Sequence, residues 1–509
     1  MALVDNDLRS IQEARILLEH VEESKEILEG LPSALVDDML VALAEHLLPR
    51  AGEYARAAVM ESDYGNAADE EALIVWVLTD LLADVRSQVP VQDIYERATT
   101  HSAEVGLSKG IVLSLLPDWI AVPTLISQVI FAIKSKSPIV FSARPRVHAA
   151  CERVMEDLLA IAQEHYYPVH ALGFLTLYAP EGEDWLAQQP NVRVIIDSRE
   201  CERMPLADPR GKDVYYASIG NNPVFVEETA DLELCAGEVV DGKTCCYGML
   251  PGAEQSVVVE EAVDDAFKAA LKRRGCYFLS DEESVRLYRI CYREDGRTYR
   301  ELIGKSAEDL ARRADIAVPD GTRVLVVERP YVSERSCFSR TKYGPVLSYY
   351  VEQNWRDACE KCIELILNSG RGNALSIFSR DPEVVRQFIL KKPVGRILVN
   401  VGTAMGSTGR RSTLPKTLTV TGWDYATTSG LGVTYRDFVR RRKVGIAAGD
   451  DAAAQELLRR AGLAGDGAPR GVRSTARPAA AHPAPERKET DGWFSSLLED
   501  MAEHETKEK

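Results

Sequence analysis

The sequence has no excess of positive charge, no long uninterrupted apolar run and no metal-ligand spacing among its cysteines. Its 61 lysines and arginines are outnumbered by 78 acidic residues, and the net charge of −17 argues against a nucleic-acid partner. Prolines and polar residues interrupt the longest apolar stretch, 112–133, so we expect no membrane span. Polar residues at 5–9 interrupt any signal-peptide core, and we expect a cytoplasmic protein with reduced thiols.

The ten cysteines are scattered without a zinc-binding pattern. Cys359 and Cys362 form a single CxxC within DACEKCIELIL, and no second pair completes a site. We interpret these two cysteines as packed on one face of a helix, and we expect no metal. The one concentrated basic run, Arg440–Lys443, is interpreted as a solvated or inter-subunit face rather than a phosphate site.

The apolar periodicity predicts an α/β fold. Residues 5–60 show helical spacing, and DNDLRSIQEAR begins with good N-cap residues. From about residue 110 strands and helices alternate, which is typical of an open parallel sheet with helices on both faces. We group strands at 171–178, 192–196 and 223–226 with this first set. A second set runs from the stretch at 242–260 to a strand at 396–401.

The segment 242–260, GKTCCYGMLPGAEQSVVVE, joins a glycine-containing loop to a β-branched run typical of a buried strand. A loop that leads into such a strand can hold a nucleophile rigidly. Cys245 and Cys246 are therefore the first candidates for a catalytic thiol. Packing of both cysteines against the strand is the alternative.

After about residue 445 the composition becomes rich in alanine, glycine, proline and arginine, which is typical of a linker. The last segment shows helical spacing beyond Asp491. Its apolar residues share one face: Trp493, Phe494, Leu497, Leu498 and Met501. This helix can dock on its own protein or on a neighbouring subunit, or bind a groove of another protein.

Seven short motifs occur in order over residues 5–445: DNDLRSIQEAR, ESDYGN, IFAIKSKSPIVFS, GNNPVFVEETAD, EQSVVVE, GPVLSYY and RILVN before a Gly/Ser/Thr-rich loop. Together they resemble the CoA-acylating aldehyde dehydrogenase family, which includes acetaldehyde and sulfoacetaldehyde types. The resemblance implies an aldehyde dehydrogenase fold with a Rossmann-like domain, a catalytic-type α/β domain and a small oligomerisation arm. It also implies NAD and CoA as cofactors.

On this basis the chain is divided into five parts. They are a dinucleotide-binding-type domain with N-terminal helices (1–240), a catalytic-type domain (241–425), a return segment or oligomerisation arm (426–446), a linker (447–488) and an amphipathic tail helix (489–509).

The family's attacking cysteine lies in a segment like S-K-T-F-D-N-G-x-x-C-A-S-E-Q. Laid on this chain without gaps, residues 242–244 match its start and Glu254 and Gln255 match its end. The nucleophile's position is then Pro251, which has no nucleophilic atom and no backbone N–H. Cys245 and Cys246 lie before that position.

Other chemical positions of the family also differ. The asparagine that donates to the oxyanion in I-P-x-x-N-P corresponds to Ile120. The glutamate of E-K-L-S-P-V-L corresponds to Thr341, and the histidine of G-H-S/T corresponds to Asn373. The scaffold motifs are kept where the chemical ones are not, so the resemblance is to a degenerate member.

The cofactor contacts are altered as well. The A-T-G-G turn beside the cofactor becomes Asp197 followed by Ser198, Arg199 and Glu200, and G-x-G-N keeps only Gly220 and the following asparagine. Glycines let a backbone approach a phosphate closely, and these side chains fill that space. Arg199 could still pair with a phosphate, whereas Glu200 would repel it.

The residues left in the family's cofactor positions are Lys134, Ser142 and Gly220. Lys134, Arg144 and Arg146 are basic residues that flank the strand at these positions, and an exposed helix end is the alternative interpretation of them.

Three functions follow as hypotheses. The first is a silent homologue that is a structural or regulatory partner of an active dehydrogenase paralogue. It would assemble through an arm at 433–443, and its tail helix would bind a shell protein inside a bacterial microcompartment. The second is an active NAD- and CoA-dependent enzyme using Cys245 or Cys246. The third is a module that binds CoA or a nucleotide without chemistry.

Overall fold

The computed structural model describes residues 5–92, 94–97, 102–199, 211–293, 297–368, 373–422, 432–445 and 456. Five helices come first: α1 (Asn6–Gly30), α2 (Ser33–Leu47), α3 (Ala51–Ser62), α4 (Ala67–Trp76) and α5 (Leu82–Ser87). The Asp5 carboxylate accepts hydrogen bonds from the first amides of α1, as the predicted N-cap requires. The helical structure expected over residues 5–60 is confirmed.

The first sheet is parallel and has the strand order β5-β4-β3-β6-β7. Its strands are β3 (Ile111–Leu115), β4 (Ile139–Ser142), β5 (Leu172–Phe174), β6 (Val192–Asp197) and β7 (Asp213–Tyr216). Helices α6 (Ala121–Ser135), α7 (His148–Glu164) and α8 (Pro180–Gln188) connect them. The α6 helix is buried on every side, and this explains the long apolar stretch of the sequence. Within the described residues, no helix is both long and apolar enough to cross a bilayer.

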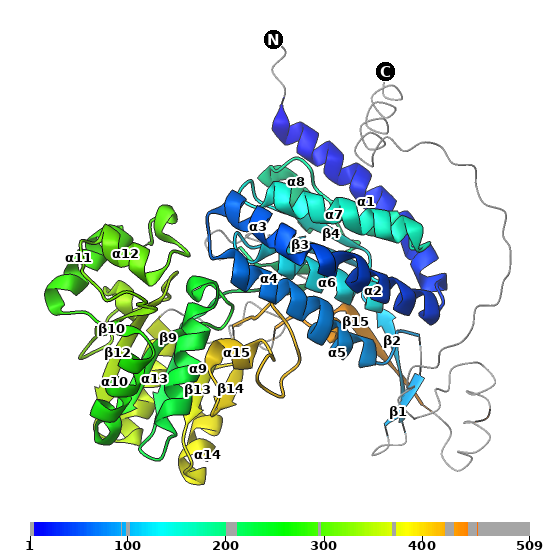
Figure 1. Ribbon diagram of the computed structural model, residues 1–509. Helices are drawn as coiled ribbons and strands as arrows, with labels where there is room; N and C mark the ends of the chain where they lie inside the picture. Colours follow the sequence, from blue (N-terminus) through cyan, green and yellow to red (C-terminus); the bar gives the residue numbers. More distant parts are fainter. Residues whose placement is uncertain are drawn as a thin grey trace.

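The second sheet is also parallel, in the order β10-β11-β12-β9-β8-β13-β14. Its strands are β8 (Asn222–Val226), β9 (Glu254–Glu260), β10 (Cys276–Phe278), β11 (Val324–Glu328), β12 (Val346–Glu352), β13 (Ala374–Phe378) and β14 (Arg396–Val399). The accompanying helices are α9 (Leu232–Thr244), α10 (Asp264–Arg273), α11 (Asp281–Cys291), α12 (Ala307–Arg313), α13 (Trp355–Asn368), α14 (Pro382–Lys391) and α15 (Thr403–Ser407). Figure 1 shows this part, green to yellow, beside the blue and cyan part that holds the first sheet.

The sequence-based grouping of the strand at 223–226 with the first set was wrong. This strand, β8, pairs with β9 and β13 in the second sheet. Both of its faces are buried, so its residues carry no alternation that could indicate which sheet it joins. The chain therefore passes from one sheet to the other between β7 and β8, before residue 240.

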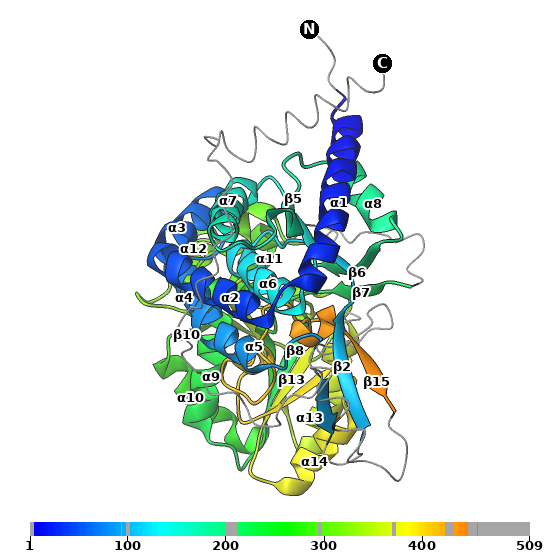
Figure 2. The same ribbon diagram turned by 90° about the vertical axis from the view of Figure 1, so that its right-hand side faces the viewer.

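A third, antiparallel sheet joins β1 (Ile94–Arg97), β2 (Ser102–Ser108) and β15 (Val439–Val444). Figure 2 shows β2 and β15 side by side below the long helix α1. The basic run on β15 is exposed in the single chain, which agrees with a solvated face. Its role as an oligomerisation arm stays a prediction.

Candidate functional site

Pro251, the residue at the expected nucleophile position, forms the corner of a tight turn before β9. The Ala253 N–H donates to the Leu250 carbonyl at 3.0 Å, and Gly252 has φ +83°. Proline followed by a glycine of positive φ is the residue pair that a type II turn favours. The Gly252 N–H also donates to the Ile219 carbonyl at 3.1 Å, and Pro251 is buried. The turn is closed and fixed to the segment between the two sheets.

The two neighbouring thiols differ sharply in environment. Cys246 is buried in the same hydrophobic cluster as Leu250, and its N–H donates to the Asp69 carboxylate at 2.7 Å. Its pKa is raised, first by its hydrogen bond with Cys245 and then by burial. The same hydrogen bond lowers the pKa of Cys245, which also lies 3.8 Å from a guanidinium nitrogen of Arg410. Of the two, Cys245 is the thiol that would ionise.

The expected oxyanion-donor position, Ile120, keeps an unusual backbone conformation. Its φ of 49° and ψ of 31° lie in the left-handed region, directly before α6. Asparagine adopts this region readily, whereas a β-branched residue there is a clear exception. The side chain is buried and packs in the large cluster beside Trp119. The backbone at Ile120 thus has a conformation that asparagine favours. The isoleucine side chain has no hydrogen-bond donor for an oxyanion.

Asn373, at the expected histidine position, links the two sheets. Its Nδ2 donates to the Ser218 carbonyl at 2.8 Å, and its side chain lies against Gly220, which has φ +79°. A Cβ atom on Gly220 would lie 2.6 Å from the Asn373 side chain. This site therefore has a packing role for both residues. Thr341 is half-buried beside Lys342, whose N–H donates to the Gln255 side chain at 2.8 Å.

The strand order of the first sheet reverses between β3 and β6, and ligands of such sheets bind at the carboxyl ends of the strands there. Arg199 follows β6 at this point. Its Nε donates to Asp197 at 3.0 Å, and it also pairs with Glu183 at 2.5 Å. All three side chains are less than a tenth exposed. The expectation that Arg199 could pair with a phosphate must therefore be corrected, because two carboxylates already hold it.

Ser198, in the same turn, is buried, and its N–H donates to the Leu115 carbonyl at 2.9 Å. Glu200 lies outside the described residues.

Other donors along this edge also face carboxylates of the chain itself. Ser142, at the end of β4, donates to Glu183 at 2.6 Å. The first amides of α7 donate to Glu61 at 3.0 and 2.8 Å, and the amides after β5 donate to Glu13 at 2.6 and 3.0 Å. Burial raises the pKa of Glu13, although its hydrogen bonds with Thr176 and Leu177 oppose this. A shallow, open pocket of about 340 Å³ at this edge is lined by Glu61, Pro145, His148, Ala149, Thr176 and Tyr178.

The structure does not bring Lys134 together with Ser142. Helix α6 runs from the carboxyl end of β3 back toward the start of β4, so its last turn lies at the opposite edge of the sheet. There the Lys134 ammonium pairs with Asp37 at 3.1 Å and donates to the Arg86 carbonyl. Gly220 lies elsewhere again, in the segment between the two sheets. The three positions predicted to contact the cofactor are therefore separated from one another.

Cys359 and Cys362 lie on the buried face of α13, which confirms their packing role. The predicted tail residues, Trp493, Phe494, Leu497, Leu498 and Met501, lie outside the described residues.

No family model matches the chain. It is 25% identical over 434 residues to the succinate-semialdehyde dehydrogenase (acetylating) of Clostridium kluyveri, covering 84% of this chain and 94% of that protein. It is also 25% identical over 403 residues to the bifunctional aldehyde-alcohol dehydrogenase of Escherichia coli, covering 79% of this chain. The match spans only 45% of that longer protein.

Comparison with solved structures gives the same similarity as the comparison of sequences. The acetylating aldehyde dehydrogenase of Geobacillus thermoglucosidasius superposes with a TM-score of 0.82 at 26% identity, covering 88% of this chain and 99% of that one. In sequence and in fold the chain is similar to CoA-acylating aldehyde dehydrogenases. A propionaldehyde dehydrogenase from a fucose-utilisation microcompartment of Clostridium phytofermentans shares the fold, with a TM-score of 0.75 at 19% identity over 84% of this chain and 96% of that one.

The groups at the carboxyl edge of the first sheet do not fit the phosphates of a dinucleotide. A helix N-terminus and free hydroxyl or amide donors attract phosphate, but here they already donate to carboxylates. An added phosphate would have to displace Glu61 or Glu183 and remain close to their negative charge.

Sequence reasoning missed Glu13, Glu61 and Glu183. Each lies on a helix, and its partners lie in distant parts of the chain. A helical glutamate is usually an exposed residue, and only its hydrogen bonds in the fold show otherwise. The short sequence around each of the three carries no signal that could have identified it.

The turn at Pro251 depends on its glycine, which gives a first prediction. We expect Gly252→Ala to lower the free energy of unfolding by about 2–3 kcal/mol, because φ is positive and a Cβ would lie 2.9 Å from the Ser407 side chain. Urea unfolding would measure the loss. Gly30→Ala is the control, since a Cβ there meets nothing within 4 Å. Equal midpoints for the two variants would contradict the assigned turn.

A second prediction concerns thiol reactivity. Cys245 is the one free cysteine of the described residues that is not fully buried, and its pKa is lowered by the hydrogen bond with Cys246. Because the thiolate is the reactive form, we expect iodoacetamide to modify Cys245 at least about tenfold faster than the other described cysteines. Peptide mass mapping over time would measure this. Faster labelling of Cys246 would show that the assignment is wrong.

Proposed function

We propose that this chain is a catalytically silent member of the acylating aldehyde dehydrogenase family. The observation that carries the proposal is the buried turn at Pro251, which has no nucleophilic atom where the family's cysteine is expected. Thiolate attack on the aldehyde is the first covalent step that the family's chemistry needs. The apolar side chain of Ile120 and the carboxylates at the edge of the first sheet support the same conclusion.

Its role, we infer, is that of a structural or regulatory partner of an active acylating dehydrogenase. The similar fold supports this, because a subunit with the fold of an active paralogue can assemble with it. The sequence of residues 489–509 supports docking of a tail helix on a shell protein, and a relative of known structure comes from a microcompartment. We propose microcompartment association on these grounds.

Calorimetric titration of NAD and of CoA into the full chain tests the loss of cofactor binding. We expect no saturable heat for NAD, because the donors that a phosphate would use are engaged. Glu61→Gln is an informative variant, since it removes one negative charge at the start of α7. Saturable NAD binding to the unmodified chain would contradict the loss of cofactor binding at the first sheet. It would favour a protein that binds a ligand without chemistry.

Co-purification tests the partner role. The full chain and a chain lacking residues 489–509 would each be co-expressed with an acylating dehydrogenase and a shell protein. We expect the full chain to retain both partners, and the shortened chain to lose the shell protein. Retention of the shell protein by the shortened chain would count against a targeting tail.

An active enzyme that uses Cys245 is the second candidate. The lowered pKa of this thiol and the nearby Arg410 favour it. Against it, Cys245 lies at the end of α9, several residues before the turn on which the family holds its nucleophile. Attack geometry tolerates little displacement. Aldehyde turnover that Cys245→Ser abolishes would establish this candidate.

A further inference from the structure

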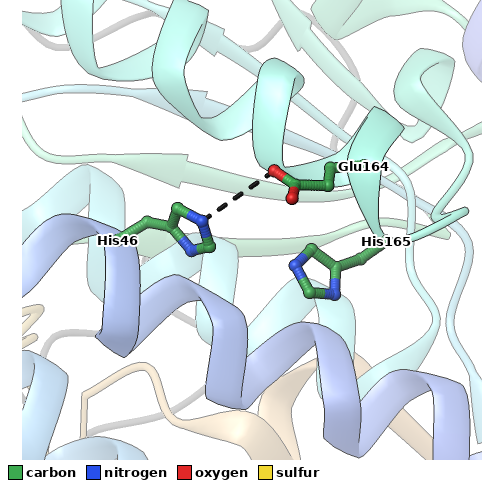
Figure 3. A group of neighbouring side chains, drawn as sticks. All are labelled: His46, Glu164 and His165. Atoms are coloured by element: carbon green, nitrogen blue, oxygen red, sulfur yellow. Dashed lines mark ion pairs between the residues drawn. The ribbon is translucent and has the colours of Figure 1, made fainter.

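Two histidines and a glutamate meet on the surface where α2 packs against α7. His46 lies in the last turn of α2, Glu164 is the last residue of α7, and His165 follows it. Figure 3 shows both imidazoles near the Glu164 carboxylate, between the two helix ends. One ligand atom of each residue lies within 4.8 Å of the other two. None of the three belongs to the turn at Pro251 or to the edge of the first sheet.

The hydrogen bonding of His46 leaves an acceptor facing another acceptor. Its Nδ1 lies 2.9 Å from the Ala42 carbonyl oxygen, which can only accept, so Nδ1 carries the proton. In the neutral ring Nε2 then has a free lone pair, and it lies 3.9 Å from a Glu164 carboxylate oxygen. A proton or a cation can bridge two acceptors that face each other in this way. A backbone carbonyl that holds the distal ring nitrogen is also the usual support of a metal-binding histidine.

His165 supplies a third ligand in a fixed position. Its Nε2 is buried and has no hydrogen-bond partner among the described residues. The backbone is held, because the His165 N–H donates to the Ile161 carbonyl at 3.0 Å, and the chain then reverses at Tyr166, which has φ 56°. A buried ring nitrogen without a partner is costly unless another group satisfies it.

We propose that His46, Glu164 and His165 bind one divalent transition-metal ion, with Zn²⁺ as the best match. Two imidazoles and a carboxylate are a ligand set that zinc accepts, with water in the fourth position. A tetrahedral zinc ion needs ligand atoms about 3.3 Å apart, given bond lengths of about 2.0–2.1 Å. The side chains of His46 and Glu164 are 43% and 69% exposed, so they can move closer around an ion. The ion joins the ends of α2 and α7.

Calorimetric titration with ZnCl₂ tests the proposal on the full chain, without a polyhistidine tag and after treatment with a chelator. We expect one ion per chain and a higher melting temperature when zinc is present. His46→Ala and Glu164→Gln should each weaken binding more than tenfold. The side chains of His46 and Glu164 are 43% and 69% exposed, so each variant should change the melting temperature of the zinc-free protein only slightly.

Glu45→Gln is the matched control, because Glu45 is an exposed glutamate beside His46 that is not part of the group. It should bind zinc like the unmodified chain. The proposal is overturned if the chain binds no zinc, or if His46→Ala and Glu164→Gln bind it unchanged. Loss of binding in Cys245→Ser instead would overturn it too, because Asp69, Cys245 and Cys246 form another group with ligand atoms close together.

Discussion

Replacing Arg199 with methionine should lower the free energy of unfolding by about 3–5 kcal/mol. The guanidinium is buried with Asp197 and Glu183, and removal of one member leaves buried charge without compensation. Burial raises the pKa of Glu183, and Arg199 acts in the opposite direction. Without Arg199 both carboxylates must stay ionised at a high cost or take up protons. Urea unfolding at pH 7 would measure the loss.

Two comparison variants separate the cost of uncompensated buried charge from the cost of removing any arginine. Arg153→Met removes an exposed ion pair with Glu53 and should cost less than about 1 kcal/mol. A triple variant, Arg199→Met with Asp197→Asn and Glu183→Gln, should be more stable than the single variant, because no buried charge remains. A triple variant that is no more stable than Arg199→Met would show that the cost comes from lost packing rather than from charge.

Replacing Glu70 with glutamine should stabilise the protein at alkaline pH by several kcal/mol, on the order of 4. Glu70 lies in the first turn of α4, it is 4% exposed, and its Oε1 has no partner within the described part of the chain. Burial raises its pKa from 4.5 to about 8. Below pH 4.5 the carboxyl is protonated in both the folded and the unfolded chain. Between pH 4.5 and 8 only the folded chain keeps the proton.

The sign of the pH dependence follows from that difference. The folded state binds more protons across this window, so the free energy of unfolding falls as pH rises, by up to about 1.4 kcal/mol per unit. Glutamine is neutral throughout, so the gain should be absent near pH 4.5 and complete above pH 8. Thermal or urea unfolding from pH 5 to 9 measures it. Glu71→Gln, at an exposed neighbour, should follow the original curve. A constant difference between Glu70→Gln and the original chain would contradict the titration.

Most of the architecture could be predicted from the sequence, because the apolar spacing is regular. The sequence pattern alone indicates the strand β9, by its β-branched run, and the helix α13, by its apolar face. The sheet to which β8 belongs could not be predicted, since a strand buried on both faces shows no alternation. Strand β7 was missed as well, because its four residues mix charged and aromatic side chains.

The candidate site was predictable only in part. The pair Pro251-Gly252 carries its own turn chemistry, so the closed turn follows from local sequence. Two other features could not be predicted from local sequence, because they depend on contacts between distant segments. They are the pairing of Arg199 with Glu183 and the capping of α7 by Glu61. The packing of α2 on α7 likewise brings His46, Glu164 and His165 together, and no short sequence motif predicts this group.

The most direct test of the account is a spectrophotometric assay of the full chain with NAD, CoA and a panel of aldehydes. The proposal predicts no NADH formation with any of them, since Pro251 has no nucleophilic atom and the phosphate-binding donors are held by carboxylates. An acylating dehydrogenase of the family, assayed in parallel, shows that the panel contains a usable substrate. NADH formation that depends on both CoA and this chain would contradict the central claim.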